Sequence, residues 1–330
     1  MAISRVGFGA LIGALAITLT ACSTPATTGS APEASATAAA AVQIEDNNGT
    51  QTIPSSLKSI VATDNRTFET LDSWGIELSA AAVALMPDTI SYKKDTSIVD
   101  LGNHREPNLE AVVAVQPDLI INGQRFSDYH DDFTKLAPNA VVLALDPREG
   151  EPLDAELKRQ TTALGEVFGK QAEAKKLNKE LDAAIKRVKD AYTEGDTVMA
   201  VITSGGQIGY AAPSVGRTLG PLFDIFGFTP ALEVPESSED HQGDDISVEA
   251  IAASNPDIIL ALDRDASFTE KEAGYVPANE LLSTSEALKN VKAVTGENIV
   301  YMPADTYTNE GIQTYTEFFN ALADALEAKS

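Results

Sequence analysis

Two arginines occupy matching positions in an internal repeat of the chain. Residues 108–120 read NLEAVVAVQPDLI and residues 247–259 read SVEAIAASNPDII, an offset of 139 residues. The same offset relates Arg125 to Arg264. Each copy predicts a short helix, a Pro-Asp stop and a buried strand, so each arginine follows the carboxyl end of a strand. A guanidinium group at that position is always charged and forks toward oxygen acceptors, which suits it to an anionic ligand.

Arg217 and Arg66 are two further cationic candidates. Arg217 follows a loop over residues 204–216 and is expected to open a helix over 218–226, whereas Arg66 stands at the head of a predicted helix over 67–74. Several guanidinium groups on one cleft floor would require a multiply charged anion. One contact between unit charges of opposite sign near ~5 Å is worth roughly 3 kcal/mol at an effective dielectric of about 20, so several contacts together could hold such a ligand. In the alternative interpretation these arginines form ordinary surface salt bridges with nearby carboxylates, namely Asp100, Asp118 and Asp263.

The three histidines of the chain stand in unrelated contexts, as His104, His130 and His241. A dedicated divalent-metal site needs several His and carboxylate ligands that converge, so this spacing does not favour one. His241 differs from the other two because it lies in an acidic, polar loop over residues 237–245, directly before the second repeat copy. We expect it on the cleft side; the alternative is a solvated loop histidine.

The sequence offers no arrangement of catalytic residues. It lacks a Gly-x-Ser-x-Gly elbow, and the glycine-rich Ser204-Gly205-Gly206 lacks the Lys-Ser/Thr of a phosphate-binding loop. No pair of carboxylates has a recognisable acid–base partner. The formal net charge of −25, without a basic stripe, also repels nucleic acid. We therefore expect a binding protein that is neither an enzyme nor a partner of nucleic acid.

The repeat also predicts the elements that position these residues. Two copies indicate an α/β fold of two Rossmann-like βα lobes, because a solenoid would need three or more copies. The expected N-terminal lobe spans residues 42–170, with a hairpin turn at Asn48-Gly49, and the C-terminal lobe spans 193–330. Between them, residues 171–192 alternate Glu, Lys and Leu at i,i+4 spacing, which predicts a single long linker helix. A ligand cleft is expected between the lobes, at the carboxyl ends of their strands.

Cys22 is the only cysteine, and it ends the string Leu19-Thr20-Ala21-Cys22. The charge at Arg5 and the apolar run after it have the layout of a secretory signal peptide, here residues 1–21. The string is similar to a bacterial lipobox, in which the cysteine carries a lipid. Residues 22–41 contain no large apolar side chain and are expected to form a flexible tether. We expect an extracytoplasmic lipoprotein that is anchored to the cell membrane through the lipid on Cys22 and has no internal disulfide.

From Val42 to its C-terminus the chain resembles the substrate-binding lipoproteins of iron–siderophore ABC importers, the helical-linker class of periplasmic binding proteins. It is most similar to the catecholate branch, of the enterobactin and petrobactin type. The resemblance implies a cleft trio of arginines, which match the motifs ending in Arg125, Arg217 and Arg264. It also implies that His241 and Tyr307 can bind Fe(III) when a siderophore leaves two coordination sites open. The two repeat glutamates, Glu110 and Glu249, would meet arginines of the permease dimer; the alternative is plain helix solvation.

The resemblance implies a function in iron transport. The protein would bind a ferric, catecholate-type siderophore in the arginine-lined cleft, with Arg66 as a further contact, and deliver it to an ABC permease. It would hold no permanent cofactor, its Fe(III) being part of the ligand, and it would act as a monomer. The alternative within the same class is a protein that binds haem, cobalamin or a hydroxamate siderophore.

Overall fold

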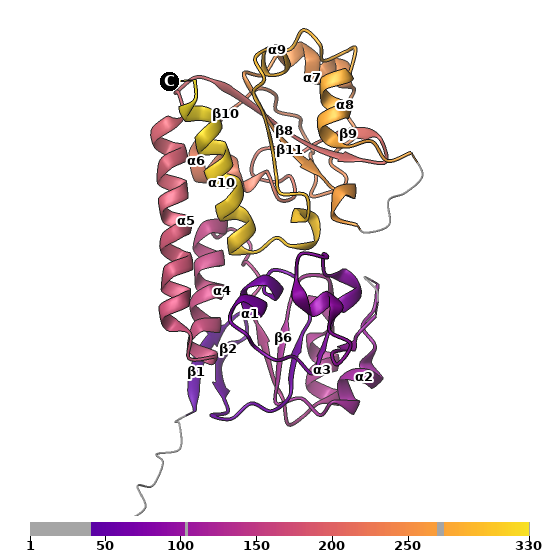
Figure 1. Cartoon of the computed structure of the whole chain (residues 1–330), viewed down its shortest axis with the longest axis vertical. Helices are drawn as coiled ribbons and strands as arrows, with labels where there is room; N and C mark the ends of the chain where they lie inside the picture. Colours follow the sequence, from indigo (N-terminus) through magenta and orange to yellow (C-terminus); the bar gives the residue numbers. More distant parts are fainter. Residues whose placement is uncertain (1–40, 103–104, 269–273, 330) are drawn as a thin grey trace, which may run out of the picture. The chain divides into compact units, whose positions relative to one another are not determined.

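The computed structural model describes residues 41–102, 105–268 and 274–329. These residues form two mainly parallel β-sheets with helices packed around them, as the sequence predicts (Figure 1). We call the part built on the first sheet the first lobe and the part built on the second sheet the second lobe. A hairpin of β1 (Val42–Asp46) and β2 (Gly49–Ile53) precedes the first sheet, and Gly49 makes its turn with a φ of +116°. The predicted turn at Asn48-Gly49 is thereby confirmed.

The first sheet has five parallel strands in the order β5-β4-β3-β6-β7. Strand β6 is buried along its whole length, as expected for a parallel sheet with both faces covered. Ile121 of β6 pairs in register with Leu143 of β7. The elements of this lobe are β3 (Ile60–Ala62), α1 (Phe68–Ser73), β4 (Ala80–Ala81), the 3₁₀ turns η1 (Val83–Leu85) and η2 (Ser91–Lys94), β5 (Val99–Asp100), α2 (Leu109–Ala114), β6 (Leu119–Asn122), η3 (Gln124–Tyr129), α3 (His130–Leu136) and β7 (Val141–Ala144).

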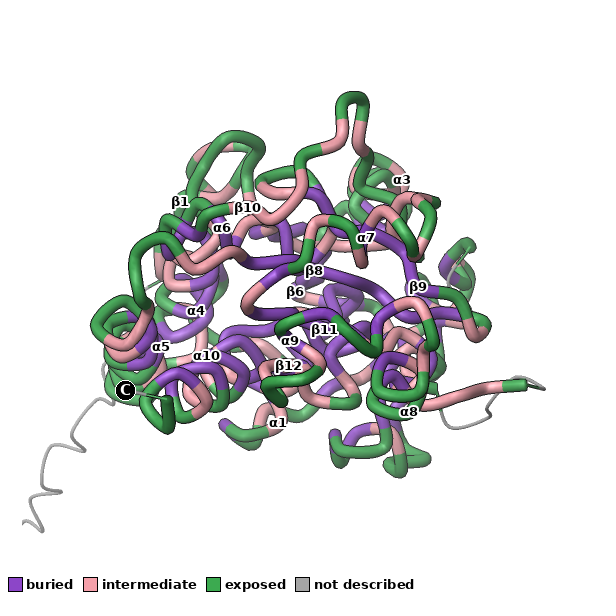
Figure 2. Tube along the Cα trace, turned by 90° about the horizontal axis from the view of Figure 1, so that it is seen from above, coloured by how far each residue is buried: buried purple, intermediate pink, exposed green. Residues whose placement is uncertain are grey.

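The second sheet has the parallel order β10-β8-β11-β12, with β9 antiparallel beside β8. Alternate residues of β8 enter two different apolar clusters: Val198 and Ala200 face one, Met199 and Val201 the other. Both faces of this sheet are therefore covered, and Figure 2 shows β8 and β11 as buried chain inside the molecule. The elements are β8 (Thr197–Ser204), β9 (Gln207–Tyr210), α6 (Pro221–Phe226), β10 (Thr229–Pro230), α7 (Val248–Ser254), β11 (Ile258–Asp263), η4 (Asp265–Ser267), α8 (Ala278–Thr284), α9 (Lys292–Thr295), β12 (Ile299–Tyr301), η5 (Thr306–Thr308) and α10 (Ile312–Glu327).

The two repeat copies fold into the same helix–strand unit. The Asn108 side chain caps α2 by accepting a hydrogen bond from the backbone N–H of Ala111 at 3.0 Å. Ser247 caps α7 by accepting from the N–H of Ala250 at 3.1 Å. The strands that follow, β6 and β11, each lie between two parallel neighbours in their sheet. Both helix starts are thus made as the polar residues before them predict.

The repeat aspartates fix the start of the neighbouring strand. Asp118 accepts hydrogen bonds from the backbone N–H groups of Lys58 at 2.6 Å and Ser59 at 3.0 Å, just before β3. Asp257 accepts from the N–H of Thr197 at 3.0 Å, at the first residue of β8. That backbone hydrogen bond, followed by the bond from Lys292, lowers the pKa of Asp257 to about 2. Both carboxylates therefore have a structural role at the end of their sheet opposite Arg125 and Arg264.

A helical hairpin connects the lobes. It consists of α4 (Leu153–Val167) and α5 (Gln171–Ala191), with a turn at Gly169 whose φ is +65°. Figure 1 shows α5 running beside both lobes. Ala174, near the start of α5, packs into the core of the first lobe, whereas Leu181 packs into the core of the second. The 21 residues of α5 span roughly 32 Å, and they form the long linker helix that the sequence predicts.

Two local expectations differ from the structure. The helix expected over residues 218–226 begins only at Pro221, because Thr218 adopts a φ of +65° and proline suits the first helical position. Helix α4 falls inside the sequence-based first lobe, yet its Leu157 packs into the core of the second lobe. Helix α5 is therefore the long linker helix, and α4 packs alongside it against the cores of both lobes.

Candidate functional site

Polar side chains gather where the parallel strands of both sheets end. In the first lobe, Asp64 follows β3, Arg125 follows β6 and Asp146 follows β7. In the second lobe, Ser204 ends β8 and Arg264 follows β11. Because the carboxyl ends of parallel strands meet at one edge of a sheet, each lobe presents these residues on one side. The hydrogen bonds and ion pairs described next connect the two edges.

The three arginines of the predicted trio converge on the ring of Tyr307. The Cζ atoms of Arg217 and Arg264 each lie 4.8 Å from the ring centroid, and that of Arg125 lies 5.6 Å away. The Nη2 atom of Arg125 also donates a hydrogen bond to the Tyr307 hydroxyl at 2.9 Å. Tyr307 is only 2% exposed, with Phe268 packed edge-on at 5.7 Å. Since Arg125 belongs to the first lobe and the others to the second, this cluster spans the lobe boundary.

Arg217 and Arg66 share a carboxylate that the sequence did not indicate. Glu310, just before α10, accepts from Nη2 of Arg217 at 3.2 Å, and Nη2 of Arg66 lies 3.5 Å from the same oxygen. Gln124 of the first lobe and Thr218 of the second lobe also donate hydrogen bonds to this carboxylate. Glu310 therefore joins the lobes through polar contacts from both sides.

Glu310 is ionised although it is buried. Its side chain is 2% exposed, and burial alone would raise its pKa. The charges of Arg217 and Arg66, with the hydrogen bond from Thr218, outweigh that effect and hold the pKa of Glu310 below its usual range. The pKa of Arg217 is raised despite its burial, because of the same carboxylate.

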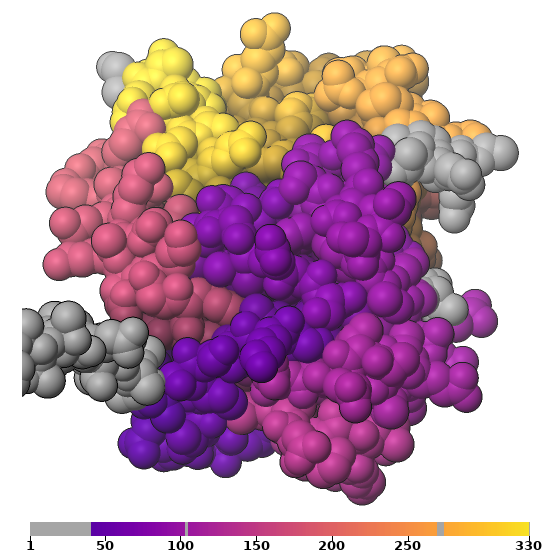
Figure 3. All heavy atoms as spheres, turned by 60° about the horizontal axis from the view of Figure 1, so that its bottom comes forward, coloured from indigo at the N-terminus to yellow at the C-terminus, as the bar shows by residue number. Residues whose placement is uncertain are grey.

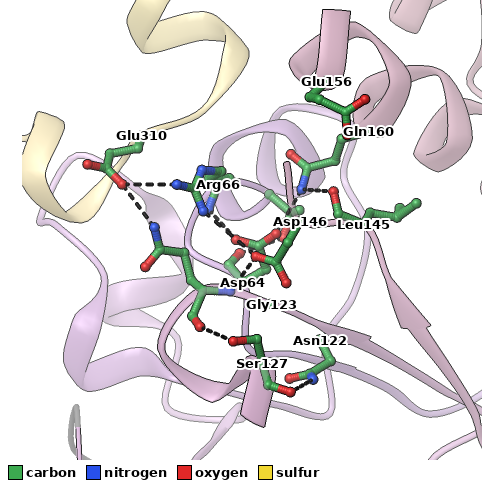
Figure 4. A network of polar contacts seen from close by, with 12 residues as sticks. Asp64, Arg66, Asn122, Gly123, Ser127, Leu145, Asp146, Glu156, Gln160 and Glu310 are labelled. Atoms are coloured by element: carbon green, nitrogen blue, oxygen red, sulfur yellow. Dashed lines mark hydrogen bonds and ion pairs between the residues drawn. The ribbon is translucent and has the colours of Figure 1, made fainter. Parts of the chain in front are cut away.

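Two aspartates lie behind Arg66, the buried Asp64 and the half-buried Asp146 (Figure 4). Asp64 accepts from Nε2 of Gln160 at 2.7 Å, and Nη1 of Arg66 lies 3.8 Å from Asp146. Burial, followed by the charge of Asp146, raises the pKa of Asp64 to about 7. Burial likewise raises the pKa of Asp146. A Cβ at Gly123 would lie 2.7 Å from the Asp64 carboxylate, so only glycine fits where β6 ends.

Arg264 is held by a neighbouring acid. Its Nη1 atom donates to Asp265 at 2.8 Å and to the Ser204 hydroxyl at 3.2 Å. The buried Nε atoms of Arg264 and Arg66 have no hydrogen-bond partner within the described ranges. Buried donors of this kind are uncommon in folded proteins.

The alternative interpretation, in which the arginines form salt bridges with Asp100, Asp118 and Asp263, is wrong. Asp118 accepts backbone N–H groups, as described above, and Asp100 accepts from the N–H of Gly102 at 3.1 Å. Asp263 accepts from the hydroxyl of Tyr275 and the N–H of Ala278, both at 2.9 Å. None of these three pairs with an arginine in the part of the chain that the structure describes.

Two adjoining cavities lie at the lobe boundary beside Arg66 and Arg217. One, of about 490 Å³, is lined by both arginines together with Gln124, Asp146 and Glu239. The other, of about 750 Å³, extends along residues 147–154 before α4. These volumes are in the range of small-molecule sites. Figure 3 shows the meeting of the two lobes at the surface, the first in indigo to magenta and the second in orange to yellow.

A third cavity on the lobe boundary has a different character. Its volume is about 600 Å³, and it is lined by residues of both lobes. Its charged lining residues are acidic, namely Glu69, Asp88, Asp305 and Glu317. An anion is therefore more favourably bound beside Arg66 and Arg217.

His241 lies within electrostatic range of the arginine trio. Partial burial, and then the positive charge of Arg264, lower the pKa of His241; Arg217 and Arg125 act in the same direction. The loop that carries it packs closely on β9, since a Cβ at Gly209 would lie 2.2 Å from the carbonyl oxygen of Gln242. The His241 side chain is 48% exposed, and its placement on the cleft side stays a prediction.

The repeat glutamates are on the surface. Glu110 lies in the first turn of α2 and Glu249 in the first turn of α7, and both side chains are exposed. Neither forms an ion pair within the described residues. One exposed carboxylate per lobe is thus available to an external partner.

Some expectations concern residues outside the described ranges. The signal peptide, the tether and Cys22 belong to this part, as does His104. Over the ranges that are described, the helices include none with the length and apolar character to span a bilayer. The same ranges contain no group of three or more His, Cys, Asp or Glu side chains arranged to hold a metal ion.

Sequence reasoning missed several residues of the site. Asp64 and Asp146 could have been found by the rule that found Arg125, because each is a charged residue soon after a buried parallel strand. The same rule applies to Asp265, two residues after β11, but Glu310 had no such signal. Glu310 has no counterpart in the repeat, and only the packing of α10 against the first lobe brings it to Arg66.

Two α/β lobes connected by a long helix, with polar strand ends that face each other, define a two-lobed ligand-binding protein. The chain belongs to the periplasmic binding protein family, whose family model matches residues 60–306. The petrobactin-binding protein YclQ of Bacillus subtilis is 26% identical over 287 residues, 86% of each chain. The ferric-anguibactin-binding protein FatB of Vibrio anguillarum is 29% identical over 272 residues, 81% of each chain. The crystal structure of the catecholate-siderophore binding protein VctP of Vibrio cholerae aligns with a TM-score of 0.73 at 25% identity, covering 86% of this chain and 99% of that one.

Proposed function

We propose that this protein binds a ferric siderophore of the catecholate type between its lobes and delivers it to an ABC permease for iron uptake. The observation that carries the proposal is the convergence of Arg125, Arg217 and Arg264 on Tyr307 at the lobe boundary. Similar proteins named for petrobactin, anguibactin and catecholate binding support the same ligand class. All of these are binding proteins, and we expect no catalytic activity from this chain.

The proposed ligand matches the chemistry of the site. Catecholates on Fe(III) form an oxygen-rich anion with exposed aromatic faces, and arginines can contact both the charge and the rings. Arg66 and Arg217 line the cavity of about 490 Å³, and Arg217 meets Arg125 and Arg264 at the ring of Tyr307. His241 and Tyr307 would supply nitrogen and phenolate oxygen to iron where the siderophore leaves two positions open. The iron would arrive with the ligand, and no resident cofactor is required.

Delivery and anchoring are further parts of the proposal. Glu110 and Glu249, one exposed on each lobe, would meet basic residues of the permease dimer. The lipid on Cys22 would hold the monomeric protein at the outer face of the cell membrane, after cleavage of residues 1–21.

The test is a titration of the purified protein with ferric complexes of a catecholate, a hydroxamate and haem, read by quenching of Trp74 and tyrosine fluorescence. We expect tight binding of the ferric catecholate, weakened about tenfold or more by Arg125→Ala and by Arg264→Ala, since each removes one charged contact. Arg187→Ala is the matched control, because Arg187 pairs with Asp324 on α10 and not with the arginine trio.

Three outcomes would contradict parts of the proposal. Preference for haem or for the hydroxamate would favour the alternative ligand class. Unchanged catecholate affinity in Arg125→Ala and Arg264→Ala would refute the role of these arginines. If His241 and Tyr307 bind the iron directly, the charge-transfer band of a ferric bis-catecholate should shift when the complex binds. If the band does not shift, or if it still shifts in a His241→Ala, Tyr307→Ala double variant, these two residues do not coordinate the iron.

A further inference from the structure

Glu310 places a permanent negative charge inside a site that is otherwise built for anions. Its carboxylate is within 3.5 Å of both Arg66 and Arg217, one from each lobe. Two of the four site arginines thus share a counter-ion that the protein itself supplies. An anionic ligand that approaches these two arginines also approaches the carboxylate between them.

The carboxylate cannot easily move away. Its side chain is 2% exposed, and Gln124 donates to it at 2.9 Å. A Cβ at the next residue, Gly311, would lie 2.7 Å from the carbonyl oxygen of Arg66, so this segment packs directly on the backbone of the first lobe. Arg217 and Thr218 belong to the same lobe as Glu310, and the carboxylate therefore stays with Arg217 in any displacement of the lobes.

The other charges at the boundary are also largely compensated. Arg264 pairs with Asp265 at 2.8 Å, and Arg66 also approaches Asp146. Within the described residues, Arg125 alone of the four arginines forms no ion pair; it donates a hydrogen bond to the hydroxyl of Tyr307. The cavity beside Arg66 and Arg217 is also lined by Glu239. The four guanidinium groups therefore face four carboxyl groups, and little positive surplus remains to attract a highly charged anion.

We propose that Glu310 is a specificity-determining residue that sets the charge of the accepted ligand, so that the site favours a ferric complex of low negative charge over a trianionic tris-catecholate. This inference rests on the proposed function, because it concerns which ferric siderophores the same site takes. A fixed carboxylate repels a ligand in proportion to the ligand's own charge. A trianion is repelled about three times as strongly as a monoanion of similar size. An arginine site without Glu310 would prefer the trianion, because the attraction between each arginine and the ligand increases with every negative charge on the ligand.

The test compares two ferric catecholate complexes of different charge. Ferric bis-catecholate is a monoanion and ferric tris-catecholate is a trianion, and both are titrated into the wild-type protein and into Glu310→Gln. We expect the wild type to bind the monoanion about tenfold or more tightly than the trianion, and Glu310→Gln to reduce this ratio about tenfold. The matched control is Glu69→Gln, another carboxylate at the lobe boundary, whose hydrogen-bond donors are the neutral Asn309 and Thr314. We expect the ratio to change less than about twofold in the control.

Each outcome decides the question. A wild type that binds the trianion more tightly overturns the inference, and this measurement does not depend on the folding of any variant. A Glu310→Gln protein that retains its thermal transition and its wild-type ratio overturns it as well. A wild type that binds neither ferric catecholate refutes the proposed function, whereas tight binding of both with the trianion preferred refutes only the role of Glu310.

Discussion

Replacement of Asp64 by asparagine should change the stability of the protein by an amount that depends strongly on pH. Asp64 is 0% exposed, accepts from the backbone N–H of Arg66 at 2.9 Å, and accepts from Gln160 at 2.7 Å. Burial and the nearby Asp146 charge raise its pKa from 3.8 to about 7. Asparagine has the shape of the protonated acid, so it keeps the fit against Gly123 without the charge.

The size of the effect follows from this pKa. Because the pKa in the folded state lies above that in the unfolded state, Asp64 contributes stability that is fully present below about pH 4 and is lost as the pH rises through about 7. A pKa that rises from 3.8 to about 7 corresponds to about 4 kcal/mol over the whole range, since a tenfold change in an equilibrium constant is worth about 1.4 kcal/mol. Between about pH 5 and pH 8 the wild type should lose about 2 to 3 kcal/mol that Asp64→Asn retains.

Urea unfolding of both proteins at about pH 5 and pH 8 measures this difference. The free energy of unfolding of Asp64→Asn relative to the wild type should increase by about 2 to 3 kcal/mol from the lower to the higher pH. Asp128→Asn, an exposed aspartate on η3, is the control and should show no such change. An equal difference at both pH values would refute the reasoning, because it would mean that Asp64 takes up no extra proton on folding.

Three further predictions concern the core, the linker and the loop of His241. Phe318→Ala should lower the free energy of unfolding by about 3 to 5 kcal/mol, because Phe318 is 0% exposed in the second-lobe core; an effect below about 1 kcal/mol in urea unfolding would contradict that packing. Glu156→Gln should cost about 2 to 3 kcal/mol at neutral pH, since Glu156 is 1% exposed and bound by Arg148 and Arg159. Burial alone would raise the pKa of Glu156, but these arginines lower it to about 2, so the cost should shrink as the pH falls below about 4; a pH-independent cost would show that the charge is not responsible. Gly209→Ala should increase hydrogen exchange in residues 237–245, because its Cβ would lie 2.2 Å from the carbonyl oxygen of Gln242; unchanged exchange with an unchanged melting temperature would show that the loop adapts without strain.

The sequence predicted most of the fold because its signals are short-range. The repeat placed two capped helices and the buried strands β6 and β11, since the N-cap residues, the Pro-Asp stop and the apolar run each act within a few residues. Strands of two residues, such as β4 and β10, carry too few positions for any periodic signal. They exist because neighbouring strands offer hydrogen bonds, which a linear pattern does not contain.

The candidate site was predictable only in part for a similar reason. Matching strand ends put Arg125 and Arg264 on the same side of their sheets, and the structure brings both to Tyr307. The carboxylates that balance the arginines were not predictable in the same way. The proximity of Glu310 to Arg66 depends on α10 reaching across to the other lobe, which is a property of tertiary packing.

The α4–α5 hairpin has a consequence for how the protein unfolds. Leu157 and Leu181 contribute to the apolar core of the second lobe, whereas Leu164 and Ala174 contribute to that of the first. If either core unfolds, apolar side chains of the hairpin become exposed, and the packing of the same two helices against the other core is weakened. Despite its two sheets, the chain should therefore behave in calorimetry as one cooperative unit, with a single heat-absorption peak for both halves.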